Sequence, residues 1–78
     1  MNIKWKSEEI VFETMQEADV RADSIGNEIY GRIYEGYITP DYKIACSLAF
    51  RLASINKSKV KTAIDESNKY KVWVEFEE

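Results

Sequence analysis

The residues best able to do chemistry in this chain are five lysines in NKSKVKTAIDESNKYKVWVEF, residues 56–76, where aromatic and charged residues alternate toward the end. Lysine ammonium groups bind phosphate oxygens, and an exposed indole offers a surface on which a base can stack. The residues of this candidate nucleic-acid site are Lys57, Lys59, Lys61, Lys69, Lys71 and Trp73. The formal net charge of −3 and the absence of an arginine cluster argue against it, and a solvated lysine face is the alternative.

A second candidate surface carries the opposite charge. Residues 8–35 hold eight acidic residues against two arginines, whereas residues 42–71 hold seven basic residues against two acidic ones. Acidic side chains four residues apart on one helix repel, and an aromatic residue among them suits an interface anchor. The predicted partner-binding residues are Glu9, Phe12, Glu13, Glu17, Tyr30 and Tyr34. An ordinary solvated helix face is the alternative here, with the halves of the chain packing charge against charge.

Catalysis has little support in the residue types. The chain has no histidine, which is the commonest general base and metal ligand. Its lone Cys46 falls in the most apolar stretch, where we expect a packed core thiol. Gly31 and Gly36 do not form a phosphate-binding motif. We therefore expect no enzyme, no catalytic residue, no cofactor and no metal.

Length and composition set the broad class. Seventy-eight residues, 45% of them hydrophobic, predict a single folded domain over 1–78. One cysteine excludes an internal disulfide, and no run of about 18 apolar residues suggests a membrane span. The first residues lack the apolar core of a signal peptide, so a cytoplasmic location is expected.

The elements that must position these surfaces begin with a predicted helix over 8–25. Ser7 is its expected cap, an apolar stripe runs from Val11 to Ile25, and Gly26 is its expected end. A hairpin that turns at Gly26-Asn27 is the rival interpretation. Residues 28–38 mix isoleucine, tyrosine and glycine, which predicts a strand, with continuation of the first helix as the alternative.

The second half of the chain predicts two more helices and the clearest strand. Thr39-Pro40-Asp41 indicates the start of a helix over 40–55, which we expect to be the central helix, buried except for a narrow polar strip. Ser58 suits the cap of a short helix over 59–67, and alternation predicts a strand over 70–77 that a segment 2–6 would join. The predicted fold is α+β, with three helices on a small sheet.

Residues 55–74, INKSKVKTAIDESNKYKVWV, resemble the end of a small antitoxin of T-even phages called discriminator of mRNA degradation. The shared features are an Asn-Lys pair, a Val-Lys pair, Ile64-Asp65 and a final strand. The resemblance implies a cofactor-free cytosolic protein that binds and blocks a host ribonuclease toxin. No binding residue is carried over, because the expected helix 8–25 has no counterpart in that family.

The function expected from the sequence is a small non-catalytic binding protein. Our first interpretation is a phage or mobile-element inhibitor, antagonistic to host defence, that binds a basic host protein through its acidic helix face. The alternative is a nucleic-acid-associated accessory protein that uses the lysine surface. A third interpretation is a subunit that self-associates, so both a monomer and a homodimer remain open.

Overall fold

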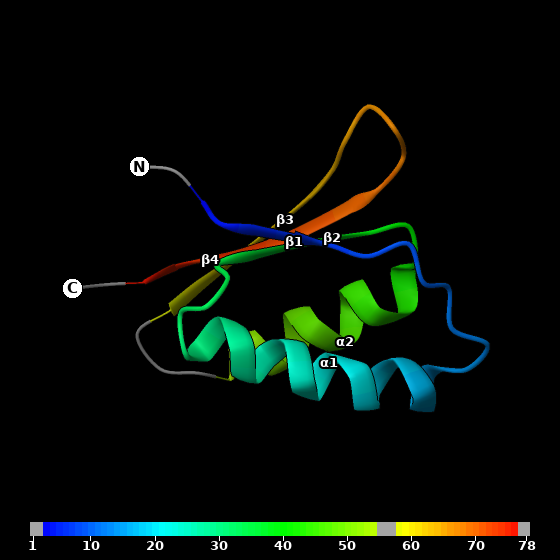
Figure 1. The fold of residues 1–78 in the computed structure, drawn as a ribbon, viewed down its shortest axis with the longest axis horizontal. Coiled ribbons are helices and arrows are strands. Elements are labelled where there is room, and N and C mark those ends of the chain that lie inside the picture. The colour runs from blue at the N-terminus through cyan, green and yellow to red at the C-terminus, as the bar shows by residue number, and fades with distance from the viewer. Residues whose placement is uncertain (1–2, 55–57, 77–78) are drawn as a thin grey trace.

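The computed structural model describes residues 3–54 and 58–76 as two helices on a four-stranded sheet. The elements in chain order are β1 (Trp5–Ser7), α1 (Met15–Tyr30), β2 (Gly36–Thr39), α2 (Tyr42–Ala53), β3 (Ser58–Ile64) and β4 (Tyr70–Phe76). The strand order is β1-β2-β4-β3, with β1 parallel to β2 and β4 antiparallel to both of its neighbours. Both helices lie on the same face of the sheet (Figure 1). The α+β class is therefore right, and the count of three helices is wrong.

The predicted helix over 59–67 is wrong because this segment is a strand and a turn. Residues 58–64 form β3, which pairs with β4 along its whole length. Val60, Thr62 and Ile64 are β-branched at every second position, which favours a strand, and this period was misread as a helix face. The connection turns through Asn68, whose φ of 61° is tolerated by asparagine, and Asp65 Oδ1 accepts the Ser67 and Lys69 amides.

The first helix begins seven residues later than predicted and continues past Gly26 to Tyr30. The alternative that it continues into residues 28–38 is therefore right for residues 28–30 only, and Ile33 lies outside the helix. Thr14 caps α1, its hydroxyl accepting the Glu17 amide at 3.1 Å, whereas residues 8–13 form no helix. Gly26 lies inside the helix and is buried against α2, and Gly31 ends it. The hairpin at Gly26-Asn27 is thereby excluded.

The predicted strand over 28–38 and the pairing of the N-terminal strand both need correction. Of that region only residues 36–38 belong to a strand, β2, which ends at Thr39. The predicted N-terminal strand over 2–6 exists as β1, three residues long, and it pairs with β2 rather than with the final strand. The final strand, predicted over 70–77, is confirmed as β4 over 70–76, and residue 77 lies outside the described residues.

The central helix is confirmed, but the prediction of which of its residues are exposed is wrong. Leu48 and Leu52 are fully buried, as expected for a central helix, and Asp41 caps α2. The polar strip is wrong, however, because Ser47 is buried while Cys46 and Phe50 are exposed. The α2 side that faces away from α1 is thus apolar and uncovered by any described element. The predicted bounds 40–55 are too wide, because α2 begins at Tyr42 and ends at Ala53, with Ser54 as its C-cap; residue 55 itself lies outside the described residues.

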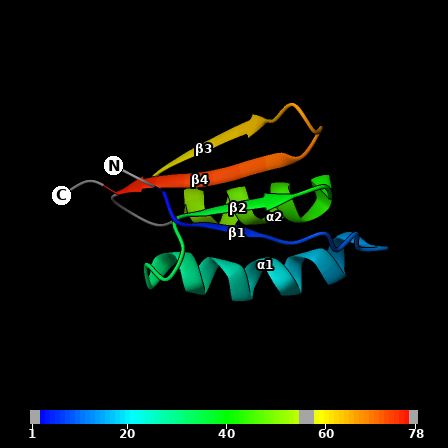
Figure 2. The same cartoon turned by 45° about the horizontal axis from the view of Figure 1, so that its top comes forward.

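The hydrophobic core lies between the helices and one face of the sheet. Its members come from α1, β2, α2 and β4, and the fully buried large side chains are Ile25, Ile29, Tyr37, Ile44, Leu48, Leu52 and Val72. No described element covers the opposite face of the sheet (Figure 2). That face is therefore where the sheet can present side chains to a partner, and we call it the open face.

Candidate functional site

The open face gathers the lysines and the tryptophan that the sequence singled out. Val72 and Val74 of β4 are buried toward the helices, so Lys71, Trp73 and Glu75 point the other way. The pairing of β3 with β4 places Lys59, Lys61 and Ala63 opposite those three residues, on the same face. The alternation that predicted this strand thus places Lys71, Trp73 and Glu75 on one side of it.

One row of residues crosses the whole sheet at the centre of this face. By register, Trp5 of β1 is opposite Gly36 of β2, Gly36 is opposite Trp73 of β4, and Trp73 is opposite Lys61 of β3. Neighbouring strands are about 4.8 Å apart. The row therefore spans about 15 Å and presents two aromatic rings, a gap and a cation. These are the only two tryptophans of the chain.

Gly36 is what lets the two indoles meet. The Trp5 ring lies over this glycine so closely that a Cβ built there would stand 2.5 Å from two atoms of the ring. Trp5 reaches across the vacant position to Trp73, with ring centroids 5.9 Å apart and planes inclined by 67°, an edge-to-face pair. Both indoles remain half-buried, so each keeps part of its surface accessible. We call these two rings the tryptophan pair.

The charge around the tryptophan pair is positive although the chain is acidic. The Lys71 ammonium lies 5.3 Å from the centre of the Trp5 ring, within range of a cation–π contact. Lys59 and Lys61 are exposed on the neighbouring strand. With Glu75 as the acidic residue among the β3 and β4 side chains of this face, the local balance is three positive charges against one negative charge. Lys59, Lys61 and Lys71 together are called the lysine group below.

Two of the six residues predicted for nucleic-acid binding do not join this group. Lys57 lies outside the described residues. Lys69 follows the turn after β3 and forms an ion pair with Glu9. This pair joins one predicted basic-site residue to one predicted acidic-site residue. Each thus satisfies the other in the folded chain.

The predicted acidic ribbon does not exist as a helix face. Glu9 and Glu13 precede α1, and only Glu17 lies within it. Glu17 is in the first turn, where the helix dipole stabilises an acidic side chain. Phe12 is not an exposed anchor, because its side chain is half-buried against the core and its amide donates to Asp41 at 2.9 Å. The prediction misread an extended segment as helical because its apolar residues matched a helical spacing.

Tyr30 and Tyr34 do not join the acidic residues either. Tyr30 is exposed at the last position of α1, thirteen residues from Glu17, which is about 20 Å along a helix. Tyr34 packs partly against the core, and the Lys6 ammonium lies 4.9 Å above its ring. The six residues predicted for a protein partner are therefore spread over both ends of α1 and the segment before it.

A partly buried polar cluster on the helix side of the sheet ties the residue after β1 to α1 and to β2. Arg21 of α1 donates two hydrogen bonds to the Glu8 carboxylate, and the Tyr37 hydroxyl donates a third at 2.7 Å. The bonds from Arg21 lower the pKa of Glu8 despite the opposing effect of burial, and Tyr37 assists. Burial, followed by the Glu8 carboxylate, raises the pKa of the Tyr37 hydroxyl above its ordinary value. The cluster fixes the chain just after β1, and hence the strand that carries Trp5.

The described residues give less support to a thiol site, a metal site or a membrane-spanning helix. Cys46 is exposed, so the predicted core thiol is wrong; the apolar stretch that suggested burial faces outward there. Within residues 3–54 and 58–76, no three acidic, cysteine or histidine side chains gather as metal ligands would. None of the described helices has the length and apolarity needed to cross a bilayer.

Comparison of the chain with protein-family models, with curated proteins and with solved structures found no match. A function for this chain therefore has to be argued from the geometry of the open face. Sequence reasoning missed Trp5 and Gly36, which complete its central row. The signal that could have found Trp5 is its place in a short charged strand, but only the register joins it to Trp73.

Proposed function

We propose that this chain binds single-stranded nucleic acid on the open face of its sheet. The observation that carries the proposal is the row Trp5, Gly36, Trp73 and Lys61, which combines accessible indole surface with a cation on a face without a covering layer. Stacking on aromatic side chains needs unpaired bases, and it contributes about 1–3 kcal/mol per base. A single strand is therefore the form of nucleic acid that this face suits.

The lysine group supplies the electrostatic part of the binding. Three phosphate contacts on a single strand correspond to a slope of about −2 in a plot of log affinity against log salt. Raising salt from about 50 to about 200 mM should then weaken binding roughly 20-fold. Half of the fourteen acidic residues belong to α1 and the segment before it, and Glu75 is the acidic residue among the β3 and β4 side chains of the open face.

Fluorescence anisotropy with labelled single-stranded and duplex oligonucleotides of one sequence tests the proposal. The single strand should bind more tightly than the duplex at about 50 mM salt. Lys61→Gln should weaken binding, whereas Lys69→Gln is the matched control, because Lys69 already pairs with Glu9. Equal loss from both variants, or no binding of the single strand at about 100 µM protein, would contradict the proposal.

A second candidate function rests on exposed apolar residues beside the acidic ones. Ile10, Val11 and Met15 are 48%, 65% and 49% exposed, and the exposed residues Glu9, Glu13 and Glu17 are close to them in sequence. We propose this segment as the surface for a basic protein partner, which agrees with the class of function that the phage antitoxin resemblance implies. Apolar contacts would supply affinity, and the carboxylates would steer a basic partner.

An amide NMR titration with a basic amphipathic peptide tests this second candidate. Signals of Ile10, Val11 and Met15 should shift, and those of the open face should not. Changing Glu9, Glu13 and Glu17 to Gln should slow association by about tenfold or more. The matched change of the lysine group to Gln should leave association unchanged or faster. The reverse pattern would assign the peptide to the open face instead.

A further inference from the structure

The outer edge of β3 is the longest free strand edge among the described residues. β3 is the last strand in the order β1-β2-β4-β3, and its seven residues pair with β4 on one side (Figure 2). No described element pairs with its other side. A row of strand amides and carbonyls that lacks a neighbouring strand is a template for another strand. The opposite edge of the sheet, β1, has only three residues and is much less suited to this.

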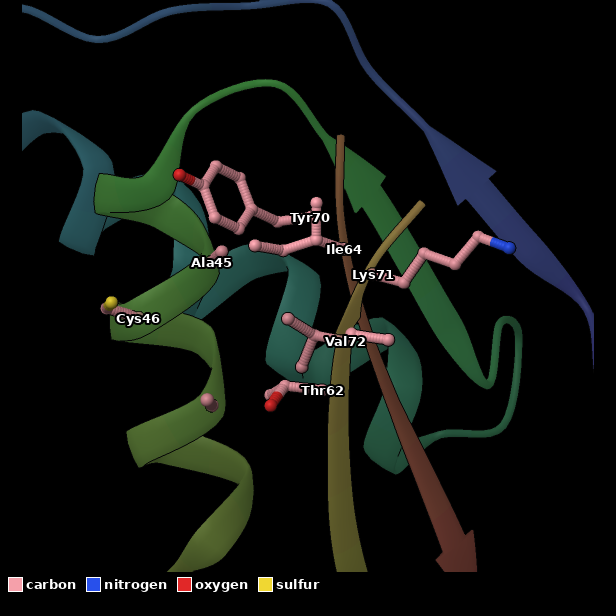
Figure 3. A pocket seen from close by; sticks show the side chains of 9 residues that line it. Ala45, Cys46, Thr62, Ile64, Tyr70, Lys71 and Val72 are labelled. Atoms are coloured by element: carbon pink, nitrogen blue, oxygen red, sulfur yellow. The ribbon is translucent and has the colours of Figure 1, made fainter. Parts of the chain in front are cut away.

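An apolar trough runs beside this edge on the helix side of the sheet. It is a cavity of about 290 Å³ between α2 and the β3–β4 hairpin (Figure 3). Its lining includes Ala45, Cys46, Ala49, Ile64 and Tyr70. Ile64 is 64% exposed, which is unusual for a large apolar residue on the core side of a sheet. The trough is therefore bounded by α2 on one side and by the β3–β4 hairpin on another, and it is open to solvent on its remaining side.

Phe50 extends this apolar surface along α2. It lies one turn after Cys46, on the same stripe of the helix, and is 80% exposed. The stripe faces away from α1, because Arg51 on the other side reaches Asp19 and Asp23 of α1. Large exposed aromatic residues beside a groove are typical anchors of protein interfaces. The edge, the trough and Phe50 together are one surface, called the β3 edge surface below.

We propose that a second copy of this chain covers the β3 edge surface, with the two β3 strands antiparallel about a two-fold axis at Thr62. In that register Val60 is opposite Ile64 of the second copy, and Lys61 is opposite Ala63 of the second copy. Continued one residue beyond β3, the same register sets Lys59 opposite Asp65. Each of these pairs occurs twice because the interface is isologous. Apolar residues thus meet apolar residues, and opposite charges meet.

An axis at Thr62 is favoured over an axis at Lys61 by charge and over an axis between two residues by the placement of the helices. An axis at Lys61 would place the two Lys61 side chains directly opposite each other, and like charges in that position are destabilising. An axis between two residues would set the helices of the second copy on the opposite side of the joined sheet. The Thr62 axis keeps all four helices on one side, where Phe50 and Cys46 of the two α2 helices face each other across the seam. The trough then becomes half of a shared core.

The dimer does not depend on nucleic-acid binding, but it affects the open face. The same axis joins the two open faces into one eight-stranded sheet, so that two tryptophan pairs and two lysine groups lie on one side. Two linked sites raise the affinity for a strand long enough to reach both. The dimer is tested with protein alone, so a dimer that binds no nucleic acid would support the dimer proposal and contradict only the proposed function.

Analytical ultracentrifugation of the protein alone tests the association. We expect a concentration-dependent rise toward twice the monomer mass. Phe50→Glu and Ile64→Lys should each weaken the dimer by about tenfold or more, and both residues are exposed enough for the monomer to accept the change. Val20→Glu, at a 68% exposed position on α1, is the matched control and should leave the dimer intact. A monomer mass throughout, up to about 1 mM protein, would overturn the proposal.

Cysteine cross-linking tests the register. In a Cys46→Ser background, Thr62→Cys should form a disulfide-linked dimer under mild oxidation, because residues opposite each other across a two-fold axis have Cα atoms about 4.5–5.5 Å apart. Ala63→Cys is the control. In this register residue 63 of one copy is opposite residue 61 of the other, so the Cα atoms of the two residues 63 are farther apart than the about 7 Å limit for a disulfide. Efficient linkage through residue 63 and none through residue 62 would overturn the register.

Discussion

At the scale of single residues, the site depends on Gly36, because a glycine has no side chain. Gly36 leaves the space into which the Trp5 ring fits, and this brings both indoles of the chain to the centre of the open face. Lys61 is the neighbour of Trp73 in the row, and the Lys71 ammonium lies over the Trp5 ring, so both place positive charge beside the tryptophan pair. Aromatic surface and charge are thus combined by register and not by sequence proximity.

Gly36→Ala should therefore displace Trp5. Its new methyl group would overlap the indole, so we expect a loss of about 1–3 kcal/mol in unfolding free energy and a red-shifted tryptophan emission. Gly26→Ala is the matched control, because a Cβ there would lie 3.9 Å from Leu48, an ordinary contact, and alanine favours the helix by about 0.5–1 kcal/mol. Urea titrations followed by fluorescence measure both effects. Equal stability of the two variants would show that Trp5 does not lie over Gly36.

Trp73→Ala should weaken single-strand binding about 5- to 150-fold, the equivalent of one lost base stack. Trp73→Phe should retain most of the affinity, because a phenyl ring also stacks. Anisotropy titrations of the two variants separate stacking from charge, since neither changes the lysine group. Similar losses for phenylalanine and alanine would mean that the indole acts only by packing against Trp5.

At the scale of elements, Asp41 joins the segment before α1 to the start of α2. Asp41 is 2% exposed, and its carboxylate accepts the Phe12 amide at 2.9 Å, the Lys43 amide at 3.1 Å and the Lys43 ammonium at 3.0 Å. Burial would raise the pKa of Asp41, but the donors from Phe12 and Lys43 outweigh burial and lower it. One side chain thus caps a helix and anchors a segment 29 residues away.

Asp41→Ala should lower the unfolding free energy by about 2 kcal/mol, because it removes a helix cap and leaves the Phe12 amide without its acceptor. Asp23→Ala is the control. Its carboxylate is 61% exposed and pairs with Arg51, so its loss should cost less than about 1 kcal/mol. Chemical denaturation of both variants decides the matter, and similar midpoints would contradict the anchoring role of Asp41.

The stability of the fold should fall as the solution is acidified. Glu8 and Asp41 have folded pKa values below their unfolded values, so their contribution is complete above the unfolded values and is lost below about pH 5. Tyr37 has a raised folded pKa, so its contribution is complete below about pH 10 and is lost as pH rises further. Denaturation at several pH values should show both slopes. Glu8→Gln should flatten the acid slope, and an unchanged slope would contradict this assignment.

How far the sequence predicts these elements depends on how much local information each contains. β4 alternates strictly, and α2 has a strong start at Pro40 and Asp41, so both could be recognised. β3 was misread because Ser58 resembles a helix cap and Val60, Ala63 and Ile64 also match a helical spacing. Only pairing with β4 decides between the two periods. The start of α1 depends on Thr14, and Ser7 offered an equally good cap upstream.

The candidate site was predicted in part for the same reason. Lys59, Lys61, Lys71 and Trp73 could be listed because they cluster in sequence. Their common face follows only from strand register, which local propensity does not specify. Trp5 is 68 residues from Trp73, and nothing local joins them. The acidic set failed because its common face required a helix that residues 8–13 do not form.

At the scale of the whole molecule, charge is divided between the two layers. Among the described residues, Glu17, Asp19 and Asp23 lie on α1, while the strand register places the lysine group on the face of the sheet away from the helices. Figure 1 shows both helices on the other face. Part of the opposite charge is paired across elements, as Lys69 is with Glu9 and Arg51 is with Asp19 and Asp23. A protein that is acidic overall can therefore present a basic face, and net charge alone is a poor guide to its ligand.

The measurement that tests the central claim most directly is intrinsic fluorescence, because both tryptophans of the chain lie in the proposed site. Titration of the unmodified protein with an unlabelled single-stranded oligonucleotide at about 50 mM salt should quench the emission to saturation. The midpoint should move roughly 20-fold higher at about 200 mM salt. Emission that stays constant through about 100 µM oligonucleotide at the lower salt would show that bases do not stack on the open face.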